Sequence, residues 1–414
     1  MMRLLRSLAL LAAGLAAGRR LRRPTTTPAS PVAPPPAPTR WRDRLRIIGA
    51  FVGMLVLLGL LVAATGLIPV KASTGHFAVT RWFLDWSKAR SVSTHSAGIH
   101  PPPRDSLLHP SLVLRGAGHY ETGCRPCHGI PTMPRPRIAR EMTAEPPSLS
   151  TQIEAFEDEE LFYIVMHGIK FTGMPAWPAR ERDDEVWAMV GFLRTLPTLD
   201  AADYRRLVRG DAPASLDAEP LADLLGPQGT PRALTTSCAR CHGLDGAGRG
   251  AGAFPKLAGQ RYEYLYAALR AYAVGSRNSG IMEPIAGGLT DDELRALARH
   301  YAALPPPAPE AAPADAIERG RTLAENGLPA QGVPPCAACH GPGAGPRNPH
   351  FPDLAGQYAD YLVLQLTLFA EERRGGSPYA PLMHPAATGL TAEQRRDVAA
   401  FYAALPPMAK SQNP

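Results

Sequence analysis

One pentapeptide, Cys-x-x-Cys-His, occurs three times in this chain of 414 residues, and the three copies contain all six cysteines. A glycine follows each copy. This pentapeptide is the attachment sequence of a c-type haem, in which both thiols form thioethers with the porphyrin and the histidine ligates the iron. The sequence therefore predicts three covalently bound haem c groups. They would be attached to Cys124, Cys127, Cys238, Cys241, Cys336 and Cys339, with His128, His242 and His340 as iron ligands.

Two other uses of a Cys-x-x-Cys pair fit the sequence less well. A zinc site built from four cysteines needs two pairs, and three pairs at separations of roughly a hundred residues leave one without a partner. A thioredoxin-type redox pair accompanies a βαβ pattern, and no such pattern surrounds these pairs. The histidine that follows in all three copies favours haem attachment.

Length and charge indicate how the chain is organised. A chain of this length predicts about three domains, in agreement with the three motifs. The formal net charge is +7, but residues 1–46 hold ten arginines and one aspartate, about +9, so the remainder carries about −2. We interpret the basic start as a membrane-topology signal rather than as a nucleic-acid-binding surface, and we expect no nucleic-acid partner.

Residues 47–70 contain no charged side chain and predict a transmembrane helix. An α-helix of 24 residues reaches about 36 Å, which is enough to cross a hydrocarbon core of about 30 Å with some tilt. Four arginines lie in residues 40–46, and only Lys71 directly follows the span, so the positive-inside rule places the N-terminus in the cytoplasm. Haem c attachment resembles the bacterial pathway that works outside the cytoplasmic membrane. The expected location is the bacterial cytoplasmic (inner) membrane, single-pass, with periplasmic haem domains.

The segment before this span, residues 1–46, is basic and proline-rich. Within it, Ser7–Gly18 resembles the apolar region of a signal peptide. Cleavage there would export Arg19–Arg46 against the charge rule. We expect a cytoplasmic extension or an over-extended start in residues 1–39, and the sequence leaves both open.

Residues 71–104 are predicted to be a juxtamembrane linker. Trp82, Phe83 and Trp86 are typical of an interfacial aromatic anchor. The three histidines of the linker, His76, His95 and His100, are expected to be solvated.

The first haem domain is predicted over residues 105–205. A short helix with Gly116 and Tyr120 should precede the motif, and helices are predicted over Glu159–His167 and Asp183–Leu196. Pro197 should stop the last of these helices.

This order resembles a class I cytochrome c: an N-terminal helix, the haem motif, Pro-x-Leu, Thr-Gly-Met-Pro and a C-terminal helix. In that family the methionine of the Gly-Met-Pro segment is the second axial ligand, which here is Met174. The rival ligands within the domain are Met133, Met142, Met166, Met189 and His167.

The second and third haem domains, residues 215–305 and 314–407, repeat each other. FPKLAGQ at 254–260 matches FPDLAGQ at 351–357, and both final helices open with a capping box. Met282 is the only methionine of the second domain. Met383 is the expected ligand of the third, because Met408 lies beyond the terminal helix; the adjacent His384 could compete. The stretch before Cys238 lacks a clear N-terminal helix.

These two domains resemble the dihaem cytochrome c-four group over about 190 residues. In class I cytochromes a loop proline orients the proximal histidine through its backbone carbonyl. The matching prolines are Pro147, Pro255 and Pro352; they could also be ordinary loop prolines. The predicted fold is all-α, with one N-terminal transmembrane helix and three class I cytochrome c domains.

Histidine and methionine ligation of all three irons would leave no open position, so we expect an electron carrier rather than an enzyme. The favoured hypothesis is a membrane-anchored trihaem cytochrome c that passes electrons to a terminal oxidase, from a quinol–cytochrome c oxidoreductase or a soluble cytochrome. The alternative is the electron-transfer subunit of a membrane-bound alcohol- or sugar-type dehydrogenase. A haem enzyme or sensor with a labile methionine is the third. Nothing in the residues gives the direction of electron flow.

Overall fold

The computed structural model describes residues 40–407 except 69, 132, 134, 210–236, 251 and 343–346. Those residues form helices and irregular segments, with three isolated β-bridges and no strand, so the predicted all-α class is confirmed. Residues 1–39, most of the stretch before Cys238 and Met408 lie outside the described part. The chain divides into two compact units, Met1–Val70 and Lys71–Pro414.

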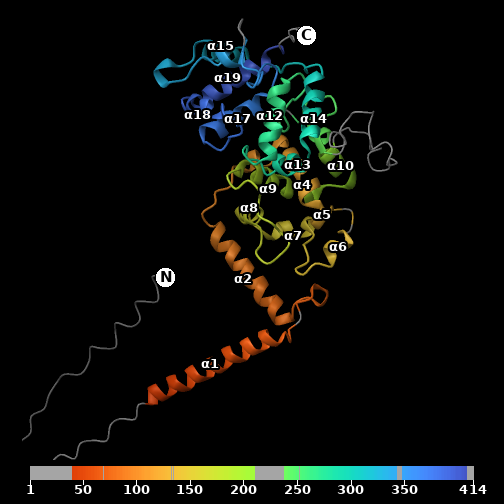
Figure 1. Ribbon diagram of the computed structural model, residues 1–414, viewed down its shortest axis with the longest axis vertical. Coiled ribbons are helices and arrows are strands. Elements are labelled where there is room, and N and C mark those ends of the chain that lie inside the picture. The colour runs from red at the N-terminus through yellow and green to blue at the C-terminus, as the bar shows by residue number, and fades with distance from the viewer. Residues whose placement is uncertain are drawn as a thin grey trace, which may run out of the picture. The chain divides into compact units, whose positions relative to one another are not determined.

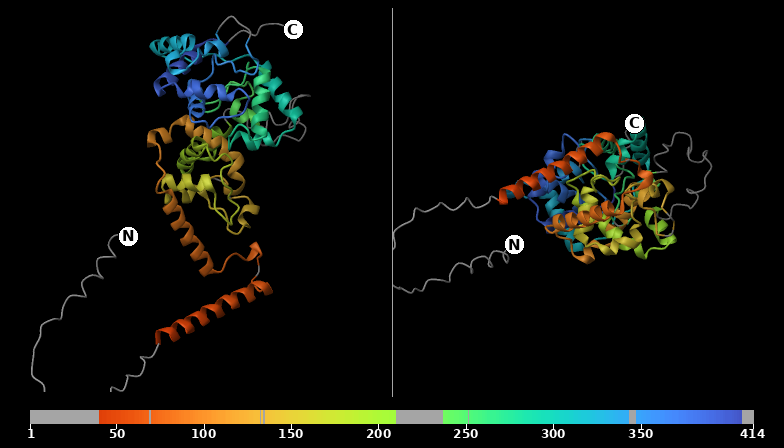
Figure 2. Two further views of the ribbon diagram at one scale, coloured as in Figure 1. Left: turned by 60° about the vertical axis from the view of Figure 1, so that its left-hand side comes forward. Right: turned by 90° about the horizontal axis from the view of Figure 1, so that it is seen from below.

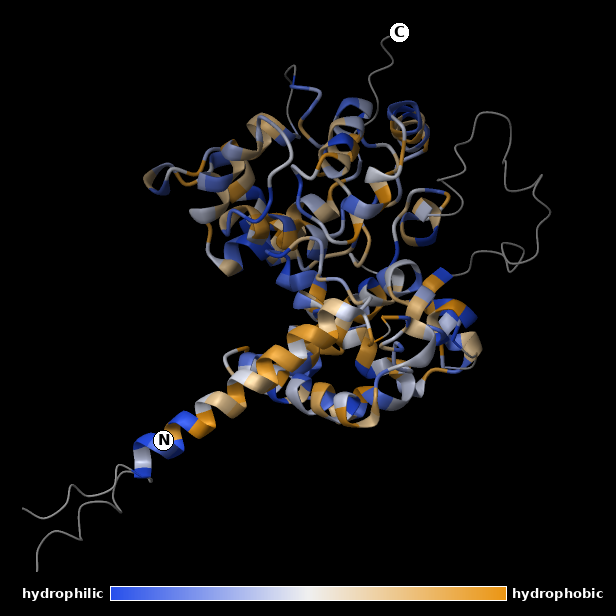
Figure 3. Ribbon diagram, turned by 60° about the horizontal axis from the view of Figure 1, so that its bottom comes forward, coloured by the Kyte–Doolittle hydropathy of each residue, from blue (hydrophilic) through white to orange (hydrophobic). Residues whose placement is uncertain are grey.

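The first unit contains helix α1, Arg40–Thr65, which is 26 residues long (Figure 1). None of its residues is buried. Figure 3 shows that the helix is hydrophilic in its first residues and mostly hydrophobic along the rest of its length. The helix begins earlier than the predicted span of 47–70 because no helix breaker lies between Arg40 and the apolar run. It ends earlier because Gly66 has a φ of +65°, a left-handed conformation typical of a residue that terminates a helix. Within the described residues, α1 is the one helix long and apolar enough to cross a membrane.

The segment over 71–104, predicted to be a juxtamembrane linker, is largely helical. A 3₁₀ turn, η1 (Ala72–Thr74), precedes helix α2 (Ala78–Ser96). Val92 and Ser96 are buried near the C-terminal end of α2, where the helix packs against α8. Trp82, Phe83 and Trp86 are more than half exposed, and the rings of Trp82 and Trp86 stack at 6.4 Å.

The segment around the first motif contains one continuous apolar core. Its central contact is the crossing of α4 (Pro110–Gly123) and α9 (Asp183–Thr195), where Gly116 of α4 lies against Ala188 and Phe192. The helices predicted before the motif, over 159–167 and over 183–196 are all present. The other elements are α3 (Arg104–Leu107), α5 (Arg125–His128), α6 (Arg137–Arg140), α7 (Leu149–Gln152), η2 (Ile153–Ala155), α8 (Asp158–His167), η3 (Leu196–Thr198) and α10 (Ala201–Arg209).

The second segment is built on α12 (Tyr262–Ala273), which packs on α14 (Asp291–Ala303). Thr290 and Glu293 form the predicted capping box, and Leu294, Leu297 and Tyr301 are buried as expected. The other helices in the described part of this segment are α11 (Ala239–His242) and α13 (Met282–Gly287).

The third segment repeats this arrangement, and its described residues include an N-terminal helix. α15 (Ala314–Asn326) crosses α19 (Ala392–Ala404) with Gly320 against Asp397 and Phe401. The other helices are α16 (Ala337–His340), α17 (Ala359–Ala370) and α18 (Ala380–Thr388), with a 3₁₀ turn, η7, at Pro329–Gln331. Figure 2 shows the green helices of the second segment beside the blue helices of the third.

Candidate haem-binding sites

Each Cys-x-x-Cys-His motif ends in a single helical turn that places its histidine last. The turns are Arg125–His128, Ala239–His242 and Ala337–His340. The glycine after each histidine has a φ between +70° and +78° and donates its N–H back to the carbonyl four residues earlier. A side chain at these glycines would be strained in the left-handed region, which explains why a glycine follows every copy.

The three motif histidines share one hydrogen bond. The Nδ1–H of His128 donates to the carbonyl of Pro147 at 3.0 Å. His242 and His340 make the same bond to Pro255 and Pro352, at 3.1 and 2.9 Å. The loop prolines are therefore placed as expected for residues that orient the histidines. With Nδ1 occupied, Nε2 is the ring nitrogen left to ligate a metal.

The protonation of these groups suits the same chemistry. Burial lowers the pKa of His128, His242 and His340, which favours the neutral imidazole that a metal needs. Burial also raises the pKa of the Cys124 and Cys238 thiols to about 12, with a smaller contribution from the second cysteine of each motif. A redox-active pair needs the opposite shift, toward a thiolate.

A tyrosine at each site was missed by sequence reasoning. The hydroxyl of Tyr120 donates to the carbonyl of Gly129 at 2.8 Å, and Tyr402 donates to Gly341 at 2.6 Å. Tyr301 makes the corresponding bond, to the carbonyl of Gly243, at 3.3 Å. Because Tyr120 lies on an N-terminal helix and the other two lie on C-terminal helices, sequence alignment of the segments does not bring the three together.

The predicted methionine ligands are all partly buried. Met174 lies in an irregular segment, whereas Met282 opens α13 and Met383 lies within α18. Of the rivals in the first segment, Met166 and Met189 are buried in the apolar core. They serve as core residues, while ligation by Met174, Met282 and Met383 stays a prediction.

Met133 and Met142, the two other methionines that could replace Met174 as the ligand, lie in different surroundings. Met133 is 58% exposed. The methyl end of Met142 lies next to Gly173, which directly precedes Met174 in the chain.

The competing histidines have other contacts. The ring of His167 contacts Tyr163 at 4.7 Å, and Nε2 of His384 lies 3.3 Å from the carbonyl of Arg374. In the predicted linker, His76, His95 and His100 are exposed, and His95 stacks on Tyr163.

Arg277, which is buried, and Arg374, which is partly buried, make the boundary between the second and third segments suitable for anionic groups. The guanidinium of Arg374 bonds the hydroxyl of Tyr264 at 3.1 Å, and Arg277, which is 6% exposed, reaches Tyr361 at 3.5 Å. Among the described residues, neither arginine has a carboxylate within ion-pair distance, and Nε of Arg374 is buried without a partner. Burial alone would raise the pKa of Tyr264, but the two positive charges lower it to about 8. Haem carries two propionates, so this uncompensated positive charge fits the group that the motifs predict.

Two glutamines join the duplicated segments reciprocally. Gln260 bonds the backbone N–H and carbonyl of Asp353, at 3.0 and 2.9 Å. Gln357 bonds the N–H and carbonyl of Lys256 in the same way, at 3.0 and 2.9 Å. Lys256 and Asp353 directly follow Pro255 and Pro352, so each glutamine contacts the loop that orients the other segment's histidine. The repeated Pro-x-Leu-Ala-Gly-Gln sequence was the available signal for this contact.

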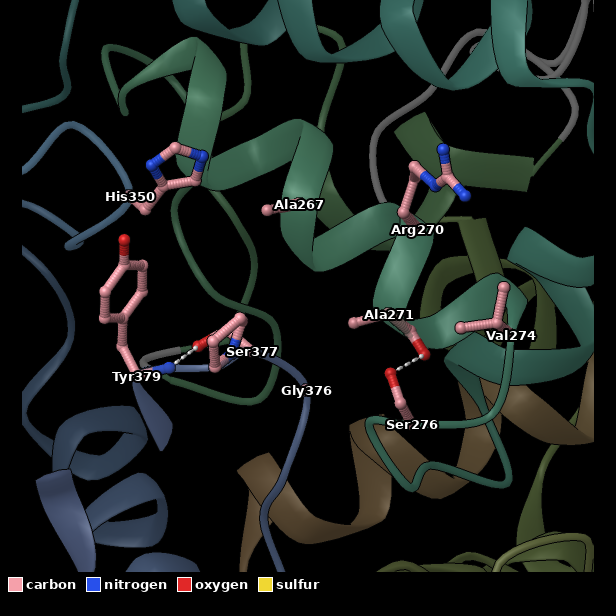
Figure 4. A pocket seen from close by; sticks show the side chains of 10 residues that line it. Ala267, Arg270, Ala271, Val274, Ser276, His350, Gly376, Ser377 and Tyr379 are labelled. Atoms are coloured by element: carbon pink, nitrogen blue, oxygen red, sulfur yellow. Dashed lines mark hydrogen bonds between the residues drawn. The ribbon is translucent and has the colours of Figure 1, made fainter. Parts of the chain in front are cut away.

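A cavity of about 240 Å³ also lies at this boundary. Figure 4 shows Arg270 of α12 and Val274, which follows this helix, on one side, and His350 and Tyr379 of the third segment on the other. The residues 376–379 that border the cavity lead into α18, which carries Met383. A group that occupied this space would contact both segments.

Comparison with known proteins places all three segments in related families. Residues 111–193 match the family model described as cytochrome c oxidase, cbb3-type, subunit III. Residues 231–301 and 317–405 match the cytochrome c family.

Individual relatives cover the second and third segments. The thiosulfate dehydrogenase electron acceptor of Thiomonas intermedia is 40% identical over 173 residues, covering 41% of this chain and 79% of that protein. Cytochrome c4 of Pseudomonas aeruginosa is 34% identical over 182 residues, covering 44% of this chain and 88% of its own length. The crystal structure of reduced cytochrome c4 from Pseudomonas stutzeri matches 42% of this chain and 95% of its own, with 30% identity and a TM-score of 0.39.

The sequence relatives are cytochromes c, and the motif geometry agrees with that family at each Cys-x-x-Cys-His segment. The chain is therefore an electron carrier that belongs to the multi-haem c-type cytochromes of the c4 group.

Proposed function

We propose that this protein is a membrane-anchored trihaem cytochrome c that transfers electrons on the periplasmic side of the bacterial inner membrane. The observation that carries the proposal is the hydrogen bond from motif histidine to loop proline, which repeats at all three motifs between 2.9 and 3.1 Å. Three independently oriented histidines, each preceded by two cysteines, imply three haems in three domains, over 105–205, 215–305 and 314–407.

Each proposed iron has one histidine and one methionine ligand. The pairs are His128 with Met174, His242 with Met282, and His340 with Met383. When bound, the haem supplies a one-electron iron centre whose potential is raised by the thioether ligand. The chain fixes the imidazole through the proline carbonyl and supplies positive charge from Arg277 and Arg374 near the boundary of the duplicated pair.

Anchoring is supported by two features of the chain. The part of α1 without charged residues, 47–65, spans about 28 Å, close to the thickness of a hydrocarbon core. In the second unit, the exposed rings of Trp82, Phe83 and Trp86 are the residue types that gather at membrane interfaces. Alkaline carbonate extraction of membranes should leave the protein in the pellet, and its recovery in the supernatant would contradict the anchor.

A terminal oxidase remains the favoured acceptor. Support comes from the match of residues 111–193 to an oxidase subunit family. We propose that the first domain delivers electrons to the oxidase and that the duplicated pair receives them.

A dehydrogenase is the second candidate partner, in the role of electron donor. The Thiomonas relative of the duplicated pair is named as an electron acceptor of thiosulfate dehydrogenase. This name favours a dehydrogenase of a sulfur compound over the alcohol- or sugar-type enzyme expected from sequence.

Two measurements test the proposal. The pyridine haemochrome absorbance of the purified protein should give three haems per chain, and two or fewer would refute the trihaem assignment. Stopped-flow absorbance should then follow reduction of the haems by thiosulfate dehydrogenase with thiosulfate, or by a quinol–cytochrome c oxidoreductase with quinol. The same method should then show that a copper–haem oxidase oxidises the reduced protein. If the oxidase does not oxidise it, the proposed role as electron donor to an oxidase is contradicted.

A further inference from the structure

Glu185, on the first turn of α9, is a carboxylate that is only 2% exposed. The hydroxyl of Ser279 donates to Oε1 at 2.6 Å, and the N–H of Gly280 donates to Oε2 at 2.7 Å. The indole N–H of Trp177 donates to Oε2 at 3.1 Å. One buried side chain of the first segment thus bonds residues separated by about a hundred positions in sequence.

These partners belong to the two loops that carry predicted methionine ligands. Trp177 lies three residues after Met174. Ser279 lies three residues before Met282, and its hydroxyl oxygen accepts the N–H of Met282 at 3.1 Å. The chain of contacts therefore leads from one methionine loop through Glu185 and Ser279 to the backbone of Met282.

A close backbone contact joins the same two loops independently of the carboxylate. A Cβ added to Gly280 would come within 2.6–2.7 Å of ring atoms of Trp177. No side chain fits between this glycine and the indole, so the loop before Met282 lies directly on the residue that follows the Met174 segment. A displacement of one loop must therefore move the other.

The negative charge of Glu185 is compensated locally. Arg182, which is 8% exposed, approaches Glu185 at 3.0 Å and donates to the carbonyl of Asn278 at 2.7 Å. Asp184 in turn pairs with Arg182 at 2.8 Å and with Arg115 at 3.3 Å. Removing one member of such a buried network leaves a charge without its partner, which is costly.

We propose that Glu185 is a positioning residue that couples methionine ligation at the first and second haems. It holds Trp177 with one oxygen and the Ser279–Gly280 turn with both, and so sets the position of the Met282 backbone. The proposal rests on ligation by Met174 and Met282, which is part of the proposed function. It adds a mechanical connection between two haem sites on different segments.

The test uses full-length holoprotein with Glu185→Gln, Glu185→Ala and Ser279→Ala. The expected result is a weaker methionine-to-iron charge-transfer band in the oxidised protein and a shifted reduction potential of the second haem. The alanine variant of Glu185 should show the larger change, and the glutamine variant should restore part of it. Ser279→Ala should shift the same haem without leaving Arg182 unpaired.

Asp397→Asn is the matched control. Asp397 is also a buried carboxylate on a C-terminal helix and pairs with Arg319 at 2.9 Å, but among the described residues no hydrogen bond joins it to a segment that carries a predicted methionine ligand. This variant should change stability while leaving the potentials of the first two haems unchanged. If the first two haems have the same reduction potentials in the Glu185→Gln and Ser279→Ala variants as in Asp397→Asn, the coupling is refuted.

A separate variant distinguishes this failure from failure of the ligand assignment. Met282→Ala should make one haem bind carbon monoxide when reduced, whether or not Glu185 has a positioning role. If it does, and the Glu185 and Ser279 variants leave the second haem unchanged, only the coupling is wrong. If Met282→Ala leaves carbon monoxide binding unchanged, the assignment of Met282 as a ligand is wrong, and the coupling proposal is refuted as well.

Discussion

Gly320 is predicted to be intolerant of even a single added carbon. It lies where α15 crosses α19, and a Cβ at this position would come within 2.6 Å of the Asp397 carbonyl carbon and 2.8 Å of the Phe401 Cβ. Ordinary contacts begin at about 3.4 Å, and the Asp397 carbonyl oxygen lies closer still than its carbon, so the two helices must separate by more than about 1 Å. Gly320→Ala therefore tests how tightly this helix pair holds the third haem site.

The magnitude follows from two opposing effects. Overpacking of a well-packed contact costs about 1–3 kcal/mol, and the upper half of that range applies because one neighbour is backbone. Alanine regains about 1 kcal/mol of helix propensity. The net loss should be about 1–2 kcal/mol, which lowers the midpoint of a segment of this size by roughly 4–16 °C.

The assay is thermal unfolding of the full-length protein, followed by circular dichroism and by the methionine-to-iron absorption band. Gly287→Ala is the control, because its Cβ would meet nothing closer than the Ala273 carbonyl oxygen at 3.7 Å. This control should be neutral or slightly stabilising. A midpoint for Gly320→Ala at or above that of the wild type would refute the packing argument.

Three further outcomes are expected. Met383→Ala should create one haem that binds carbon monoxide when reduced, and an unchanged visible spectrum would assign the ligand elsewhere. Tyr402→Phe should cost about 1–2 kcal/mol, because it leaves a buried glycine carbonyl without its donor; the longer bond of Tyr301 predicts a smaller loss in the same melt. Burial and the charge of Arg240 lower the pKa of His119 from 6.5 to about 4. The unfolded chain therefore binds the extra proton, stability should fall as the pH decreases through that window, and His119→Gln should flatten this part of a pH series of melts.

Local rules were sufficient for most of the helices. The capping boxes at Thr290 and Thr391 are present, and the helices that follow them begin where the boxes predict. A capping box depends on a short motif whose geometry is set by nearby residues, so a single sequence carries enough information. The contacts of the loop prolines with the motif histidines were expected only from the resemblance to class I cytochromes c.

The features that could not be predicted from the sequence depend on contacts between residues far apart in the chain. The sequence of α2 looked like a polar linker with aromatic residues, and its folded end packs against α8, more than sixty residues away. Asp183, Asp184 and Glu185 form an acidic first turn of α9, an arrangement that is favourable at any helix N-terminus. Only the folded chain shows that Glu185 contacts Ser279, because nothing in local periodicity relates these two positions.

The reciprocal bonds of Gln260 and Gln357 have a consequence for the internal symmetry of the molecule. A contact in which the same residue of each half binds the same position of the other is the isologous contact of a two-fold symmetric dimer. At this contact the two halves are thus related like the subunits of a two-fold symmetric dimer, within one polypeptide. The positions that the glutamines bind differ in charge: Lys256 reaches the Gly356 carbonyl at 2.7 Å, while Asp353 pairs with Arg261 at 2.9 Å. A covalently linked dimer can accumulate such asymmetry between its two redox centres, which identical subunits cannot.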